Sequence, residues 1–375
     1  MPTEHNLRAI LDLARWAPSG DNTQPWRFEV VDAHHVVVHG FDTRGHCVYD
    51  LDGHASELSL GTLLETMAIA ASGQGLAMQA RRRSEAPTGR PTFELRFTPD
   101  AGVRPDPLLG SIERRSVQRR AMSTRRLTAQ EKRALEAAVA PHGRVLWRED
   151  FSQRLAMARL LSAIAKVRLS MPEAYRVHRD IIEWKARFSI DRVPDQALGV
   201  DAVTARLMRF VLGSWERVRF FNRYLAGTAA PRLQMDLLPG VACAAHFVLL
   251  ASREPRTIDD HVAAGRAVQR FWLTATHLGL NLQPATTPLI FGRYLREQRP
   301  FTTQPGLEAE TARAVQRLET LLGPQALRQA VFMGRVGAGP AARSRSLRLP
   351  LQQLEVVRAQ PSGSAREQRP LSRAG

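Results

Sequence analysis

The chain has 375 residues, of which 44% are hydrophobic and 24% are charged. This balance is typical of a soluble globular protein that is long enough for one large domain or two modest ones. Only two cysteines occur, Cys47 and Cys243, which excludes a disulfide framework and favours a cytoplasmic protein. The N-terminus lacks the apolar stretch of a signal peptide, and the longest apolar run, 241–251, is too short to cross a bilayer, so no membrane partner is expected.

The formal net charge is +17 and comes almost entirely from arginine, because lysine occurs at only three positions, Lys132, Lys166 and Lys185. A charge of this size is compatible with nucleic-acid binding. The arginines are mostly scattered, however, and no recognised nucleic-acid-binding module accompanies them. We therefore expect compact anionic groups such as phosphates as partners and no nucleic acid, with a basic nucleic-acid-binding protein as the less favoured alternative.

The chain opens with apolar residues at helical spacing, and residues 27–31 and 36–39 then read as two strands joined by a short turn. Between the helix and the first strand lies a polar loop, Ala17-Pro-Ser-Gly-Asp-Asn-Thr-Gln-Pro-Trp26. Pro18, Gly20 and Pro25 constrain its backbone around five hydrogen-bonding side chains. Such a rigid polar loop is typical of a binding surface, although an ordinary helix-to-strand turn explains the composition equally well.

Histidines are concentrated just after this loop, around Cys47, at His34, His35, His39, His46 and His54. On a strand, His35 and His39 would share a face and could form a ligand pair. Yet neither a Cys-x-x-Cys nor a His-x-x-x-His motif is present, and histidines of strands are more often plain surface or core residues. No metal site is therefore predicted.

An internal duplication is indicated by two apolar stretches, the first of which, 56–79, predicts a long helix. Six of its residues recur without a gap, each 204 positions later (265 − 61 = 204): Gly61, Glu65, Ala71, Gly75, Leu76 and Gln79 match Gly265, Gln269, Ala275, Gly279, Leu280 and Gln283. The alternative is two unrelated buried helices that both favour Gly and Ala. A strand at 92–97 and a Pro-rich linker complete a first half, which we place at 1–105.

The second half, 106–350, opens with the basic run Ile112-Glu-Arg-Arg-Ser-Val-Gln-Arg119. It contains a helical insert at about 150–240 that has no counterpart in the first half, with helices expected at 151–169, 172–188 and 202–225. The last of these is interpreted as a lid over a cofactor pocket, with a membrane-surface helix as the alternative. Strands are expected at 241–251 and 331–337, and 351–375 reads as a disordered tail.

Four segments carry a resemblance to one known family. The loop Ala-Pro-Ser-Gly-x-Asn-Thr-Gln-Pro-Trp resembles that of FMN-dependent nitroreductases, in which it approaches the flavin. The run 112–119 resembles the family's phosphate clamp, and Gly279-Leu-Asn-Leu-Gln-Pro-Ala-Thr-Thr287 resembles the segment facing the reactive edge of the ring. The run 339–348 resembles the C-terminal phosphate contact. The clamp has two residues between Ser116 and Arg119 where short members have one, a form associated with long, fused members.

This resemblance covers most of 7–350 except the insert, and it implies an α+β, nitroreductase-like fold. Two fused halves, each an antiparallel sheet flanked by helices, would pack as a pseudo-dimer within one chain, and further self-association is left open. The implied cofactor-binding residues are Ser19, Gly20, Asn22, Gln24, Arg114, Arg115, Ser116, Arg119, Pro284, Thr286, Thr287, Ser346 and Arg348. The implied cofactor is FMN, with NAD(P)H as electron donor.

The implied function is an FMN-dependent oxidoreductase that passes electrons to a small organic acceptor, and flavin storage without efficient turnover is the alternative. The flavin would perform the redox chemistry, so no catalytic acid or base is identified. The polar loop occurs only in the first half, and the phosphate clamp occurs only in the second. One flavin per chain is therefore expected.

Overall fold

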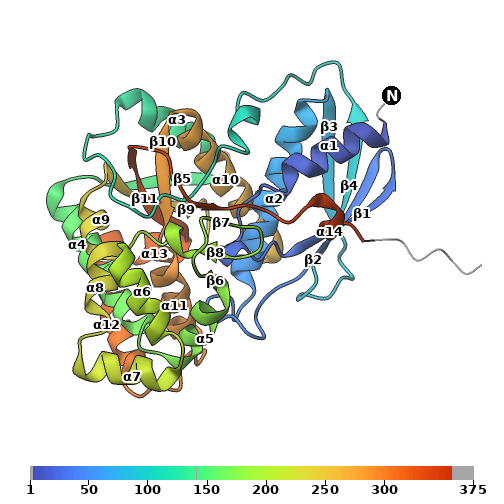
Figure 1. Cartoon of the computed structure of the whole chain (residues 1–375). Helices are drawn as coiled ribbons and strands as arrows, with labels where there is room; N and C mark the ends of the chain where they lie inside the picture. Colours follow the sequence, from blue (N-terminus) through green and yellow to red (C-terminus); the bar gives the residue numbers. More distant parts are fainter. Residues whose placement is uncertain (1–2, 141, 357–375) are drawn as a thin grey trace, which may run out of the picture.

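Two four-stranded antiparallel sheets, one on each side of a pair of long helices, organise the molecule (Figure 1). The computed structural model describes residues 3–140 and 142–356. The prediction of an α+β protein with two antiparallel sheets flanked by helices is confirmed.

The two sheets repeat one topology. In the first half the elements are α1 (Glu4–Ala14), β1 (Trp26–Asp32), β2 (His35–Gly40), α2 (His54–Ser72), β3 (Leu76–Arg82) and β4 (Thr92–Pro99). In the second half they are α3 (Ala129–Val139), β5 (Gly143–Arg148), β9 (Ala245–Ala251), α10 (Ile258–His277), β10 (Leu280–Pro284) and β11 (Ala330–Ala338). The strand orders, β1-β2-β4-β3 and β5-β9-β11-β10, are equivalent. Both halves therefore follow the order helix, strand, strand, helix, strand, strand.

The central helices α2 and α10 pack directly against each other, and each covers one sheet. The inner face of α2 forms a core with β1, β2 and β4, whereas α10 packs on the second sheet. Nearly every residue of α2 is buried, as expected for a helix that is apolar on all sides. The charged Glu65 on α2 binds Arg266 and Arg270 of α10 at 2.8 and 2.6 Å. This helix pair is the structural centre of the molecule.

The predicted helix at 56–79 is wrong in its last turns. Helix α2 ends at Ser72, and residues from Leu76 onward form the strand β3. Gly75 has a φ of 65° and Gly279 a φ of 70°, so each glycine adopts the left-handed conformation that turns the chain from helix into strand. The repeated Gly-Leu pairs therefore mark two helix-to-strand turns.

The insert between β5 and β9 is mainly helical. Its elements are α4 (Phe151–Arg168), α5 (Pro172–Ile181), β6 (Ile182–Glu183), β7 (Phe188–Ser189), β8 (Val193–Pro194), α6 (Ala202–Val211), α7 (Trp215–Tyr224), α8 (Ala229–Arg232), a π-helical turn (Leu233–Leu237) and α9 (Leu238–Val241). The expected helix at 172–188 is shorter than predicted. The helix expected at 202–225 is divided in two, because the Ser214 hydroxyl caps a new helix by accepting from the Arg217 amide.

Three helices that the sequence did not predict connect β10 to β11: α11 (Thr287–Arg296), α12 (Leu307–Leu322) and α13 (Pro324–Gln329). The expected tail is also partly wrong. After β12 (Arg345–Ser346) the chain returns to the first half, where α14 (Leu351–Leu354) buries Leu351 and Leu354 in the core beneath β1 (Figure 1). The rest of the expected tail, 357–375, lies outside the described residues.

Candidate functional site

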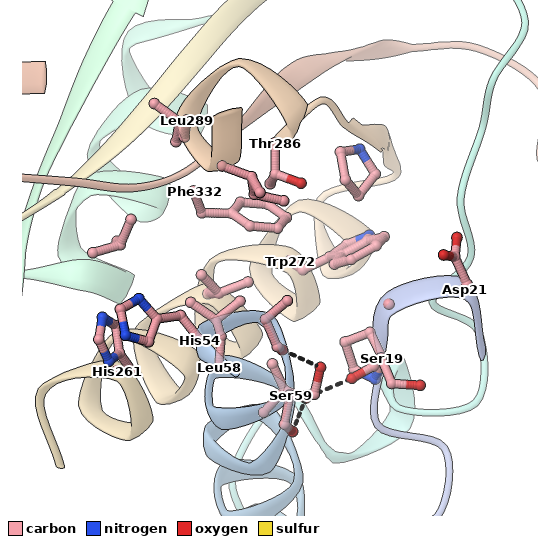
Figure 2. Close-up of a pocket in the computed structure, with 18 of the residues that line it drawn as sticks. Ser19, Asp21, His54, Leu58, Ser59, His261, Trp272, Thr286, Leu289 and Phe332 are labelled. Atoms are coloured by element: carbon pink, nitrogen blue, oxygen red, sulfur yellow. Dashed lines mark hydrogen bonds between the residues drawn. The ribbon is translucent and has the colours of Figure 1, made fainter. Parts of the chain in front are cut away.

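A cavity of about 890 Å³ is lined by both halves of the chain. Its walls come from the polar loop (17–26), α2, the segment 115–119, α10, the start of α11 and the C-terminal segment 344–348. Its middle is apolar: Figure 2 shows Leu58, Trp272, Leu289 and Phe332 around it, with Ser19 and Asp21 on one side. A volume of this size is in the range that accommodates a cofactor or a drug-sized ligand.

The polar loop is held in a strained backbone conformation. Asp21, Asn22 and Gln24 have φ values of 49°, 64° and 48°, in the left-handed region that residues other than glycine seldom occupy. Gly20, the glycine of the loop, is not in this region. From α2, the Thr62 hydroxyl donates to the Pro18 carbonyl at 2.8 Å (Figure 2), so the loop is fixed against the central helix.

Two amide side chains of this loop bind other segments of the chain. The Asn22 amide donates to the carbonyls of Ile190 and Leu347, each at 3.2 Å. The Gln24 amide donates to Ile190 at 2.9 Å, and its oxygen accepts from the Leu349 amide at 2.9 Å. Asn22 and Gln24 are 5% and 0% exposed. They therefore anchor the loop to the insert and to the C-terminal segment.

Three arginines, here called the arginine cluster (Arg115, Arg345 and Arg348), gather beside the polar loop. Arg115 donates to the Trp16 carbonyl at 2.9 Å, Arg348 donates to the Ala17 carbonyl at 3.0 Å, and Arg345 lies over the Trp16 ring at 5.0 Å. None of the three forms a salt bridge with a carboxylate among the described residues. The Nε atoms of Arg115 and Arg345 are buried without a hydrogen-bond partner there.

The positive charges of the arginine cluster are therefore poorly compensated. Burial, followed by the charges of Arg345 and Arg15, lowers the pKa of Arg348 to about 9. Burial and the neighbouring Arg348 and Arg345 lower the pKa of Arg115 well below its usual value. Buried like charges without acidic partners are costly, and an anion bound between them removes that cost. A phosphate or carboxylate fits the donors that these guanidinium groups present.

Comparison with known proteins shows what the chain is similar to. The family model described as "Nitroreductase family" matches residues 1–58, which include the polar loop and the start of α2. Two proteins, one from each of two strains of Mycobacterium tuberculosis, are 28% identical to the chain over 293 residues, or 77% of this chain and 78% of theirs. Each is provisionally named an NAD(P)H nitroreductase. The chain is similar to proteins of the nitroreductase family.

One solved structure also overlaps with this chain. It is a nitroreductase-like family protein from Bacillus cereus, with 12% sequence identity, 67% of this chain and 96% of that chain covered, and a TM-score of 0.33. A likeness at this level carries no argument about the site.

The structure brings most of the predicted cofactor-binding residues to the one cavity. Ten of them line it: Ser19, Gly20, Asn22, Arg115, Ser116, Arg119, Pro284, Thr286, Ser346 and Arg348. Three do not. Gln24 is fully buried, and its side chain does not reach the cavity surface. Arg114 is exposed to solvent outside the cavity, and Thr287 does not line it either. The role of the ten as cofactor ligands stays a prediction.

Several lining residues had no signal in the sequence. Trp272 belongs to α10, and its ring lies 4.7 Å from the Arg115 guanidinium. Asp21 is the variable position of the loop motif, and it is one of the residues that line the cavity. Burial raises the pKa of Asp21, while Arg119 and Arg168 oppose the shift. Arg345 also lines the cavity, and it immediately precedes Ser346, the residue for which a phosphate contact was predicted. Only the folded chain shows that these side chains meet.

The interpretation of 202–225 as a lid is wrong. No residue of α6 or α7 lines the cavity, and the only residues of the insert that do are Val193 and Ala197. The apolar side of α6 instead packs beside Ile182 and Val193 in a separate small core. Among the described residues, no helix combines the length and apolar character needed to cross a membrane.

Proposed function

We propose that the protein binds FMN in this cavity and transfers electrons from NAD(P)H to a small organic acceptor. The observation that carries the proposal is the arginine cluster, a set of poorly compensated positive charges at the side of a cavity whose middle is apolar. A flavin mononucleotide has the matching parts, a planar apolar ring system and a terminal phosphate. The names of the mycobacterial relatives support the donor and the reaction class.

The roles of individual residues follow from their positions. Arg115 and Arg348 would hold the phosphate by charge-assisted hydrogen bonds, and Ser116 would add a hydroxyl donor. The ring system would lie against the apolar middle of the cavity, near Trp272 and Thr286 (Figure 2). When bound, the flavin supplies the chemistry of accepting and donating a hydride. The side chains of the cavity would bind it, orient it and limit the access of water.

The visible absorption spectrum of the purified protein tests cofactor binding directly. We expect a bound flavin, and we expect flavin-free protein to bind FMN at least about tenfold more tightly than riboflavin, because riboflavin lacks the phosphate. Equal affinities would show that the arginine cluster does not bind phosphate, and a protein that binds neither would refute the proposal.

Electron transfer is tested by adding NADPH or NADH to the flavin-loaded protein without oxygen. Loss of the flavin absorbance, followed by its return when a quinone or nitroaromatic compound is added, is the expected result. A tightly bound flavin that both nucleotides leave unreduced would favour storage as the function.

A further inference from the structure

Two histidines on the wall of the cavity and a glutamate beside them meet at a distance from the arginine cluster. His54 and Glu57 come from the first turn of α2, and His261 comes from the first turn of α10. One ligand atom of each lies within 4.8 Å of the other two. In Figure 2 the two imidazoles lie on the far side of Leu58 from Ser19 and Asp21. We refer to them as the His54–Glu57–His261 cluster.

Two residues of the cluster are buried and His54 is half-buried, and each of the three has a polar atom without a well-formed hydrogen bond. Glu57 and His261 are 5% and 6% exposed. His54 Nδ1, Glu57 Oε2 and His261 Nδ1 have no hydrogen-bond partner among the described residues. His261 Nδ1 and Glu57 Oε2 are 2.8 Å apart but are not aligned as a hydrogen bond. Buried polar atoms without well-formed hydrogen bonds are costly, and native structures seldom leave such atoms without an occupant.

The chemistry of these atoms indicates a metal ion as the occupant. A neutral imidazole nitrogen and a carboxylate oxygen both offer lone pairs, and two imidazoles with one carboxylate form a common ligand set for zinc in sites that keep one position open. His54 and His261 line the cavity, so the open position would face it. Water or an oxygen atom of the second substrate could then complete the coordination.

A second carboxylate lies beside the cluster. Asp52 Oδ2 is 3.5 Å from His54 Nδ1, where it would orient the imidazole as an outer carboxylate does and leave Nε2 as the metal-binding nitrogen of His54. Arg293 binds Asp52 at 2.6 Å. The two charges of that pair offset each other, so the carboxylate of Glu57 remains to neutralise a bound cation. The imidazole rings are stacked, with centroids 3.8 Å apart and planes inclined by 27°, and they would turn so that their nitrogens converge on an ion.

We propose that His54, Glu57 and His261 bind one divalent transition-metal ion, such as zinc, at the junction of the two halves. The site does not depend on flavin binding, and it adds a Lewis acid to the wall of the cavity in which the second substrate would react. Its ligands come from equivalent ends of the duplicated helices, since Glu57 and His261 are separated by the repeat length (261 − 57 = 204).

The test is a titration of the full-length protein with Zn²⁺, after metal has been removed with a chelator and in the absence of flavin. We expect one tightly bound equivalent per chain. His261→Gln and His54→Gln should each lower the affinity at least about a hundredfold, and Asp52→Asn should lower it about 10- to 100-fold. The matched control is His39→Gln, which removes the histidine of a different His–carboxylate pair, His39 Nε2 to Glu29 Oε2 at 2.9 Å. It should leave the titration unchanged.

X-ray absorption of the zinc-loaded protein should show nitrogen and oxygen ligands at about 2.0–2.2 Å and no sulfur. The proposal is overturned if no equivalent binds, or if zinc binds equally well to both histidine variants, which would place it elsewhere. Circular dichroism shows whether each variant is folded. If only one of the two histidine variants folds, the zinc titration of that variant tests the proposal. Because no flavin is present, the result is independent of the proposed oxidoreductase function.

Discussion

Gly61 of α2 and Gly265 of α10 lie in direct backbone contact, and each glycine packs against the equivalent part of the other helix. A Cβ atom on Gly61 would lie 2.1 Å from the Val262 carbonyl oxygen, and one on Gly265 would lie 2.1 Å from the Leu58 carbonyl oxygen. Val262 and Leu58 are themselves one repeat length apart (262 − 58 = 204). The two helices therefore cross as equivalent helices do across the two-fold axis of a symmetric dimer.

The first prediction concerns this helix crossing. Gly61→Ala should destabilise the protein by more than about 2 kcal/mol, because its methyl group would overlap the backbone of α10, which no side-chain rotation can relieve. Urea unfolding of the variant and of the wild type measures the difference. The control is Gly110→Ala, since a Cβ there meets no atom within 4 Å. Equal stability of both variants would mean that the helices separate at little cost.

The second prediction concerns the phosphate. Arg348→Ala should remove a charge-assisted interaction of about 1.5–3 kcal/mol and so weaken FMN binding about 10- to 100-fold, while riboflavin binding changes little. Fluorescence titration with both ligands provides the comparison. Arg114→Ala is the control, because Arg114 is adjacent to Arg115 but exposed and outside the cavity. A loss of FMN affinity in the control as large as in Arg348→Ala would contradict the placement of the phosphate.

The third prediction is the number of cofactors. One flavin per chain is expected, because residues from both halves line one cavity and the loop that connects α3 to β5 is much shorter than the polar loop. Flavin released by denaturation, divided by the protein concentration, should therefore approach one. Residues 1–105 alone should bind none, since they lack the arginine cluster. A ratio near two would reveal a second working site.

The fourth prediction concerns the effect of low pH on stability through the buried His178. Burial, followed by the charge of Arg168, lowers the pKa of His178 to about 3, and the Tyr49 hydroxyl lies 2.9 Å from its Nε2 atom. In the unfolded chain a histidine has a pKa near 6.5. Below that pH the histidine is protonated in the unfolded state but stays neutral in the folded state, so protons favour unfolding. The free energy of unfolding should fall as the pH falls, by up to about 1.4 kcal/mol per pH unit for this group.

His178→Gln should reduce that slope, whatever its effect on stability at neutral pH. Urea unfolding at pH 7 and pH 5 gives the slope for each protein, and exposed His5→Gln serves as the control. If the difference between pH 7 and pH 5 were the same for all three proteins, His178 would not be buried in its neutral form.

Sequence reasoning succeeded where the pattern is local. The spacing of Leu7, Ile10, Leu11 and Ala14 gave α1, and the alternation near Val36 gave β2. It failed at β3, where a short apolar run after a helix is compatible with either structure until the left-handed Gly75 is known. It also missed α11, α12 and α13, which bury their apolar faces against the insert and the second sheet.

The candidate site was partly predictable for the same reason. A motif can bring attention to Ser19 or Arg115, but it does not reveal that Asn22 and Gln24 bind the insert and the C-terminal segment. Glu57 and His261 are far apart in the sequence, and neither belongs to a metal-binding motif. Their proximity is a consequence of how the duplicated helices cross. Contacts of that kind depend on the whole fold and leave no local pattern.

The crossing of α2 and α10 within one polypeptide has a consequence for assembly and for evolution. Two separate subunits must meet before a shared site exists, so the fraction of working sites depends on protein concentration. Here the covalent link fixes the effective concentration of one half for the other, and dilution cannot dismantle the cavity. In a symmetric dimer every substitution also appears twice. In this chain each half can mutate alone, so a substitution in the polar loop has no second copy elsewhere in the molecule.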